Sequence, residues 1–349
     1  MQRIAKLTAA PLLSTTGEGR PGAENLPTNA PFFIVGSGRS GSTLLRMMLC
    51  CHSRLAIPPE TWYLLALLER LSIDRPLSAA ELEVAEATIT QEYRWPDLKL
   101  DAQEFRRRLG QLTAPYLRDV VEVIYRWHLE AEGKARWGDK TPIYVEIVPQ
   151  LARMFPGSRF IHLVRDGRDV ARSHQTAGWY GPWLHDNTRE WTRALECHRR
   201  WAQTDALRER ILQVHYEDLV LDTEGTLRRI CHFIGEKFEP AMLSWQEKVD
   251  EQVPERERHI HVKLKRRIDT GGVARWKGEM SARELLVAEA FMGEHLSYAG
   301  YERAYRGPLW APAFMATRLY CRTVLPAVQL QLRAARFLRR RLAPRSAVK

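Results

Sequence analysis

The sequence predicts a three-layer α/β fold, in which a central, mostly parallel sheet is flanked by helices. Three short apolar segments are the strand candidates, at residues 32–35, 160–164 and 211–216. Long helical patterns separate them, which is typical of parallel strands joined by crossover helices. The chain has 349 residues and 45% hydrophobic content, enough to bury a sizeable core in one large domain.

The first strand candidate leads directly into a glycine-rich loop. The loop has the sequence Gly36-Ser-Gly-Arg-Ser-Gly-Ser-Thr43, and its glycines at 38 and 41 allow the backbone to approach a ligand closely. Unpaired N–H groups at the start of the helix that follows would carry partial positive charge and hold an anion. Further donors suited to phosphate or sulfate oxygens come from Arg39, Ser40, Ser42 and Thr43.

Two other interpretations of the loop stay open. The spacing of Gly36 and Gly41 is that of a nucleotide-triphosphate loop, but that motif needs lysine where Ser42 stands, which weakens a kinase or ATPase interpretation. Gly36, Gly38 and Gly41 also match a dinucleotide-binding fingerprint, and Glu60 lies near the place of its ribose-binding acid. A second anion site is needed to choose among them.

A second donor-rich segment covers residues 159–173. Its apolar strand ends at Arg165, a helical pattern follows, and Ser173 lies two helical turns on. Ligands of open α/β sheets sit outside the carboxyl ends of the strands, which predicts that Arg165 lies near the mouth of the first loop. An arginine and a hydroxyl there would hold a phosphate. The two segments together favour a ligand with phosphate groups at two separated positions.

With these two segments the chain resembles the sulfotransferases that use 3′-phosphoadenosine-5′-phosphosulfate, especially the branch of tyrosylprotein sulfotransferases and many bacterial members. The resemblance implies a P-loop-like form of the predicted fold, this cosubstrate and no requirement for a metal. Gly38 and the residues up to Thr43 would hold the 5′-phosphosulfate, and Arg165 with Ser173 the 3′-phosphate. Three further segments match in family order, at residues 137–142, 216–220 and 271–277. The similarity covers about residues 32–305.

The resemblance also implies chemical roles. Sulfuryl transfer requires little covalent chemistry from a protein, so a base, a cation and positioned donors should suffice. Glu60 matches the carboxylate base of the tyrosylprotein branch, and Lys140 matches the cation that stabilises the leaving group. Arg39 would grip the transferred group. Tyr216 and Arg266 are the remaining expected cofactor contacts.

Simpler interpretations exist for several of these residues. Glu60 could be an acid in the first turn of a helix, and Lys140 could form a surface salt bridge with Asp139. Arg266 lies in the basic run 263–267, and charge runs are usually solvated. Some relatives carry an arginine where Ala177 stands, which puts the 3′-phosphate contacts in doubt. The rival bases are His52, His162 and His174.

Composition and charge set limits on the partners. The net charge of +11 fits anionic cofactors, glycans, nucleic acids or anionic membranes alike. Because no zinc spacing, ribonucleoprotein aromatic pattern or helix-turn-helix signature stands out, no nucleic-acid partner is expected. The five cysteines show no metal-ligand spacing, so we expect reduced thiols and no metal site.

The sequence also predicts a domain organisation. Residues 1–30 resemble a disordered leader, residues 31–306 form the sulfotransferase domain, and residues 72–132 form a helical cap within it. Residues 307–349 mix apolar side chains with arginines as a basic amphipathic tail, which favours docking on the domain or a partner, or contact with a membrane surface. We expect a cytoplasmic enzyme, which membrane contact of the tail would hold at the inner membrane face.

The expected function is transfer of a sulfuryl group to an acceptor hydroxyl, on a carbohydrate or glycolipid. The alternatives within this chemistry are a protein tyrosine and a small phenol or alcohol. From other classes, a P-loop nucleotide-dependent kinase and a non-catalytic nucleotide-binding module stay open. Acceptor recognition is expected in loops such as residues 175–187, where aromatic side chains could stack on a sugar or a phenol.

Overall fold

The computed structural model describes residues 29–325, apart from residues 179, 182, 259–261, 266–267 and 269. Nearly all of the predicted leader, and the tail beyond residue 325, lie outside the described residues. The chain groups into two compact units. The first comprises residues 1–165 and 193–273, and the second comprises residues 166–192 and 274–349. The predicted boundaries at residues 30 and 306 stay predictions.

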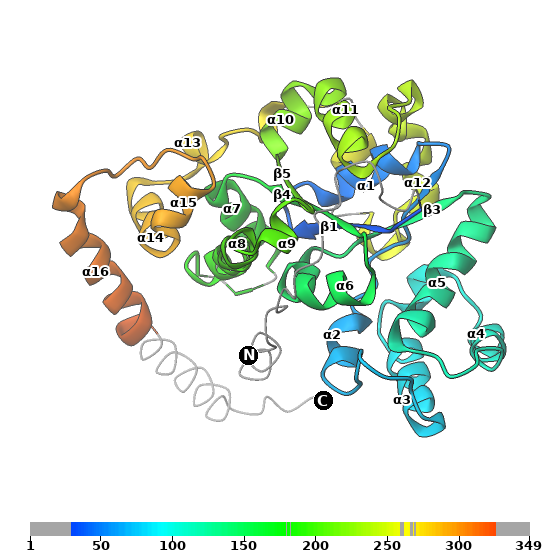
Figure 1. Ribbon diagram of the computed structural model, residues 1–349. Coiled ribbons are helices and arrows are strands. Elements are labelled where there is room, and N and C mark those ends of the chain that lie inside the picture. The colour runs from blue at the N-terminus through cyan, green and yellow to red at the C-terminus, as the bar shows by residue number, and fades with distance from the viewer. Residues whose placement is uncertain are drawn as a thin grey trace, which may run out of the picture. The chain divides into compact units, whose positions relative to one another are not determined.

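The described part of the first unit contains a five-stranded parallel sheet (Figure 1). Its order is β2-β3-β1-β4-β5. The strands are β1 (Phe32–Gly36), β2 (Leu55–Ala56), β3 (Arg136–Lys140), β4 (Arg159–Val164) and β5 (Ile211–His215). The predicted α/β class with a parallel sheet flanked by helices is thus confirmed. The third predicted strand was one residue too long, because Tyr216 already begins a helix.

Both faces of the sheet are buried, which explains the continuous apolar runs of β1 and β4. Phe33 and Val35 point into one apolar cluster, and Phe32 and Ile34 point into another on the opposite face. The helices of the first unit supply most other members of the two clusters. They are α1 (Ser42–Cys50), α2 (Tyr63–Leu68), α3 (Ala79–Thr90), α4 (Ala102–Leu109), α5 (Leu117–Glu132), α6 (Val148–Met154), α9 (Asp205–Arg208), α10 (Tyr216–Leu221), α11 (Thr223–Ile234) and α12 (Val249–Gln252).

Short 3-10 turns link these helices. They are η3 (Trp95–Leu98), η4 (Pro142–Ile147), η6 (Pro240–Leu243), η7 (Trp245–Lys248), η8 (Glu255–Glu257), η9 (Val262–Lys265) and η10 (Thr270–Gly272). Residues 72–132 are mostly helical and hold α3, η3, α4 and α5. Ser78 and Glu81 form a capping box that fixes the start of α3, and Asp101 caps α4.

The register of the sheet brings several loop starts to one edge. Ile34 pairs with Lys140, Gly36 with Leu163, and Val164 with His215. The carboxyl ends of β1, β3, β4 and β5 therefore lie side by side, where open α/β sheets bind their ligands. The glycine-rich loop follows β1 at this edge.

The second unit is built on helices. They are α7 (Gly167–Ala177), η5 (Asp186–Thr188), α13 (Trp276–Glu279), α14 (Ala282–Met292), α15 (Glu294–Tyr298), η11 (Pro308–Trp310), α16 (Ala311–Leu319) and the π-helix η12 (Tyr320–Val324), while α8 (Arg189–Ala202) crosses the boundary. The buried Arg168 organises this unit, since it binds Asp166 and Glu289, each at 2.8 Å, and stacks on Trp276.

Among the described residues, no helix is long and apolar enough to cross a membrane.

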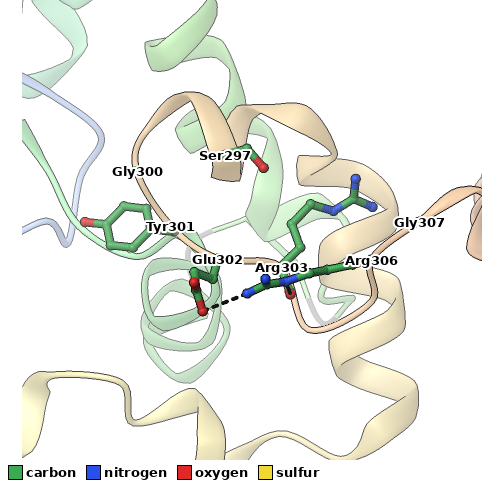
Figure 2. A pocket seen from close by; sticks show the side chains of 7 residues that line it. All are labelled: Ser297, Gly300, Tyr301, Glu302, Arg303, Arg306 and Gly307. Atoms are coloured by element: carbon green, nitrogen blue, oxygen red, sulfur yellow. Dashed lines mark hydrogen bonds and ion pairs between the residues drawn. The ribbon is translucent and has the colours of Figure 1, made fainter.

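A cavity of about 450 Å³ opens in the second unit (Figure 2). An ion pair of 2.7 Å between Glu302 and Arg306 lies at its wall. The residues that line it are Ser297, Gly300, Tyr301, Glu302, Arg303, Arg306 and Gly307. None of the site residues predicted from the sequence is among them.

Candidate active site

The glycine-rich loop is pressed against its neighbours at two glycines. Gly36 has φ +148°, and a Cβ atom there would lie 2.5 Å from the carbonyl oxygen of Leu163. Gly41 has φ +93°, and its Cβ would lie 2.5 Å from the ring of Tyr216. Both positions therefore require glycine for lack of space as well as for backbone conformation. The loop and Tyr216 consequently form one packed surface.

Gly41 stands at the N-cap position of helix α1 and offers no side-chain cap, and no acidic residue occupies the first turn. The hydroxyl of Ser40 is buried without a hydrogen-bond partner among the described residues. Arg39 holds a left-handed backbone with φ 64°, which is strained for a residue with a side chain. A helix N-terminus without a side-chain cap, next to a buried hydroxyl without a partner, has the donors that an anion would need.

Arg165 contacts the loop, Tyr216 and the segment around Gly272. Its guanidinium donates to the carbonyl oxygens of Gly272 at 2.7 Å and Arg39 at 3.2 Å, and it lies 4.6 Å from the ring centre of Tyr216. Burial lowers the pKa of Arg39, and the nearby charge of Arg165 lowers it further. An anion bound near both guanidinium groups would offset this repulsion. The structure thus brings Arg165, Tyr216 and the loop together.

The other predicted phosphate contacts stay predictions. Ser173 lies on α7 in the second unit, so its pairing with Arg165 stays a prediction. Arg266 lies outside the described residues. Arg168 and Arg172, which could stand in for the arginine missing at Ala177, bind carboxylates within the second unit.

Lys140 and Glu60 form a direct ion pair. The Lys140 ammonium donates to Glu60 Oε1 at 2.6 Å and to the hydroxyl of Thr43 at 3.3 Å. Only 3% of the Lys140 side chain and 15% of the Glu60 side chain are exposed. A surface salt bridge between Lys140 and Asp139 is therefore wrong, because Lys140 is buried and pairs with Glu60. Consecutive side chains of a strand point to opposite faces, which separates the two residues of β3.

Glu60 Oε2 has partners of its own. The indole N–H of Trp62 donates to it at 2.7 Å, and the guanidinium of Arg94 lies 3.4 Å away. Burial raises the pKa of Glu60, but Lys140 and Arg94 together outweigh burial and lower it to about 2. Glu60 is therefore a carboxylate at neutral pH. Trp62 has φ 50°, so the backbone beside this carboxylate is strained.

A buried polar network holds the backbone behind the pair. Asp139 accepts hydrogen bonds from Tyr125 at 2.9 Å and from Thr61 at 3.1 Å, and Thr141 accepts from the backbone N–H of Thr61. Thr61 follows Glu60 in the chain, while Asp139 and Thr141 flank Lys140. Burial raises the pKa of Asp139 to about 6. The network therefore links the backbone that carries Glu60 to the backbone that carries Lys140.

Two of the rival bases, His162 and His52, have contacts of their own. His162 is buried and stacks on His198 with 4.5 Å between ring centres, and burial holds its pKa well below its ordinary value. His52 binds the carbonyl oxygen of Lys237 at 2.9 Å. His174 lies in the second unit. In the part of the chain that the structure describes, no group of three His, Cys, Asp or Glu side chains could hold a metal ion.

Residues 31–240 match the model of the sulfotransferase family. The chain belongs to this family. The match begins at β1 and includes the glycine-rich loop, the segment around Lys140 and Glu60, and Arg165. It ends before Gly272, whose carbonyl oxygen binds Arg165.

Curated relatives lie in the same family. Protein-tyrosine sulfotransferase 1 of Danio rerio is 28% identical over 251 residues, which are 68% of this chain and 64% of the relative. The nodulation protein NoeE of Sinorhizobium fredii is 30% identical over 156 residues, which are 44% of this chain and 33% of that protein. The chain thus spans less than two thirds of the length of each of these two relatives.

Solved structures show the same fold. The sulfotransferase domain from the Synechococcus PCC 7002 olefin synthase has a TM-score of 0.56 and 22% identity, covering 84% of this chain and 100% of the domain. The sulfotransferase domain from the curacin biosynthetic pathway has a TM-score of 0.52 and 22% identity, covering 80% of this chain and 99% of the domain. These likenesses confirm the P-loop-like α/β fold.

Proposed function

We propose that this chain transfers a sulfuryl group from 3′-phosphoadenosine-5′-phosphosulfate to an acceptor hydroxyl. The observation that carries the proposal is the position of the Lys140 ammonium, between the Glu60 carboxylate and the Thr43 hydroxyl of α1. A base and a cation therefore meet at the start of the helix that follows the anion-binding loop. Family membership supports the same chemistry.

The residues present fit this cosubstrate. The loop offers backbone N–H groups, the guanidinium of Arg39 and the unpaired hydroxyl of Ser40 to a phosphosulfate. Arg165 and Tyr216 offer a charge and a ring beside it. When bound, the cosubstrate supplies an activated sulfuryl group on a phosphate leaving group. No metal is needed for this transfer, because the protein itself supplies the positive charge.

The roles of the side chains follow from their charges. Glu60 takes the proton of the acceptor hydroxyl as that oxygen bonds to sulfur. Lys140 stabilises the negative charge that remains on the phosphate oxygen when the sulfur–oxygen bond breaks. Arg39 holds the oxygens of the transferred group. The products are a sulfate ester and 3′-phosphoadenosine-5′-phosphate.

For the acceptor we propose a carbohydrate or glycolipid hydroxyl, with a tyrosine or another phenol as the alternative. The relatives that carry the name protein-tyrosine sulfotransferase support the alternative. The test is transfer of radiolabelled sulfate to three parallel panels of glycans, tyrosine peptides and small phenols, with EDTA present. Labelled product in one panel would identify the acceptor class, and transfer that requires added Mg²⁺ would contradict the mechanism.

We also infer a cytoplasmic location with peripheral contact at the inner membrane face. Supporting it, Leu309, Met315 and Leu319 are 90%, 71% and 63% exposed, and Arg318 and Arg322 lie on the same segment. The test is flotation of the full chain with anionic and neutral vesicles. Met315→Asp with Leu319→Asp should abolish flotation with anionic vesicles, whereas Leu221→Asp, at an exposed leucine of α10, should not. Equal flotation of all variants would overturn the inference.

A further inference from the structure

Glu60 faces a second cation besides Lys140. Lys140 holds Oε1 of the carboxylate, and Arg94, just ahead of η3, lies 3.4 Å from Oε2. Trp62 adds a neutral donor to Oε2. Among the described residues, the charged groups that pair with Glu60 are thus the ammonium of Lys140 on β3 and the guanidinium of Arg94 in the predicted cap region.

Arg94 is held in place by contacts that do not involve Glu60. Its Nη1 donates to Glu257 at 2.6 Å, and its Nε donates to the hydroxyl of Tyr93 at 2.8 Å. The guanidinium lies 5.3 Å from the ring centres of both Trp62 and Tyr93, and only 12% of the side chain is exposed. Because a planar guanidinium with this many contacts has little freedom, its charge stays beside Glu60.

Lys140, by contrast, could exchange Glu60 for another anionic partner. It already reaches the Thr43 hydroxyl of α1, and an anion bound at the loop would compete with Glu60 for the ammonium. A lysine is a compact charge on a flexible stem, so it can follow such an anion. Arg94 is then the cation that remains beside Glu60 among the described residues.

We propose that Arg94 is a positioning residue, which keeps the Glu60 carboxylate ionised and oriented while Lys140 binds the anionic cosubstrate. This inference rests on the proposed function. Its electrostatic basis is that burial favours the protonated form of Glu60, whereas a nearby positive charge favours the carboxylate. Without Arg94, the pKa of Glu60 should rise, and less of the base should be ionised when Lys140 is engaged.

The test compares Arg94→Gln, Arg94→Lys and the matched control Arg256→Gln. Arg256 belongs to the same cluster, since it pairs with Asp97 and stacks 4.8 Å from the Tyr93 ring centre, but its partners do not include Glu60. The first readout is the ¹³C carboxyl resonance of Glu60, assigned by its loss in Glu60→Gln. It is followed with bound 3′-phosphoadenosine-5′-phosphate from pH 8 down to the lowest pH at which every variant stays folded. The second is the pH profile of kcat/KM for the acceptor.

In Arg94→Gln, we expect the Glu60 titration and the acid limb of the profile to move up by about one to three pH units. The KM for the cosubstrate should stay unchanged. In Arg94→Lys, the acid limb of the pH profile should return close to its wild-type position. In Arg256→Gln, it should stay at the wild-type position. A limb and a resonance that do not move in Arg94→Gln would overturn the role of Arg94, even if activity fell. A wild-type chain without transfer or bisphosphate binding would instead overturn the proposed function and this inference with it.

Discussion

The Lys140 ammonium lies 2.6 Å from the Glu60 carboxylate, and the pair is almost fully enclosed. In the proposed mechanism Lys140 is the cation and Glu60 is the base, so the ion pair already brings together the two opposite charges that the reaction would use. The Lys140 ammonium lies between Glu60 and α1, because it also donates to the Thr43 hydroxyl. The predictions below test each side of the pair.

Replacing Glu60 by Gln should abolish transfer and spare cosubstrate binding. The amide keeps the size of the side chain and can still accept from Lys140, but it cannot take a proton from the acceptor. We expect kcat to fall about 10²- to 10⁴-fold, the usual contribution of a general base. Calorimetry should show the affinity for 3′-phosphoadenosine-5′-phosphate within about threefold of wild type, and full retained activity would contradict the assignment.

Replacing Arg165 by Ala should weaken bisphosphate binding. The variant removes the guanidinium that joins Gly272, Arg39 and the Tyr216 ring. Loss of a charge-assisted hydrogen bond costs about 1.5–3 kcal/mol, which corresponds to a Kd at least tenfold higher. Arg229→Ala is the control, since that arginine is 48% exposed and pairs with Asp218 on the surface. A loss of affinity shared equally by both variants would point to net charge alone.

Replacing Gly41 by Ala should damage the loop. The new Cβ would lie 2.5 Å from the Tyr216 ring at a backbone φ of +93°, so either the ring or the loop must shift. We expect a loss of stability of about 1–3 kcal/mol and strongly reduced bisphosphate binding. Gly278→Ala makes the same change where no atom lies within 4 Å, and it should behave as wild type in both measurements. Tight binding by Gly41→Ala would contradict the packed loop.

Asp139 should make the fold less stable as pH rises. Its folded pKa is about 6 against an ordinary value of 3.8, so the folded state binds more protons between these values. The resulting loss in the free energy of unfolding is absent below pH 3.8 and complete above pH 6, where it amounts to about 3 kcal/mol. Denaturant unfolding of wild type and Asp139→Asn between pH 4 and pH 7 should give a difference that changes across this window. A constant difference would contradict the raised pKa.

Local patterns in the sequence predicted some strands of the sheet and not others. Strands β1 and β4 are continuous apolar runs and were found, because both their faces are buried. Strand β3 has the sequence Arg-Trp-Gly-Asp-Lys, and its charges hid it. Each charged side chain of β3 is buried with partners elsewhere in the chain, such as the carbonyl oxygens that Arg136 binds. Such compensation is tertiary, so no local period can indicate it.

The site shows the same division. The loop, Arg165 and Lys140 stand at strand ends, where a motif and its place in the fold coincide. Arg94 gave no such signal, because its partners Glu60 and Glu257 lie 34 and 163 residues away in the sequence. The strained Trp62 and the polar network around Asp139 were missed for the same reason. Residues that act by holding a functional group become visible only when the chain is folded.

The most direct test of the central claim is calorimetric titration of the purified chain with 3′-phosphoadenosine-5′-phosphate, beside ATP with Mg²⁺ and beside NAD. The arrangement of the loop, Arg39, Lys140 and Arg165 predicts selective, metal-independent binding of the bisphosphate at one site. Preference for ATP with Mg²⁺ or for NAD, with no binding of the bisphosphate, would contradict the account.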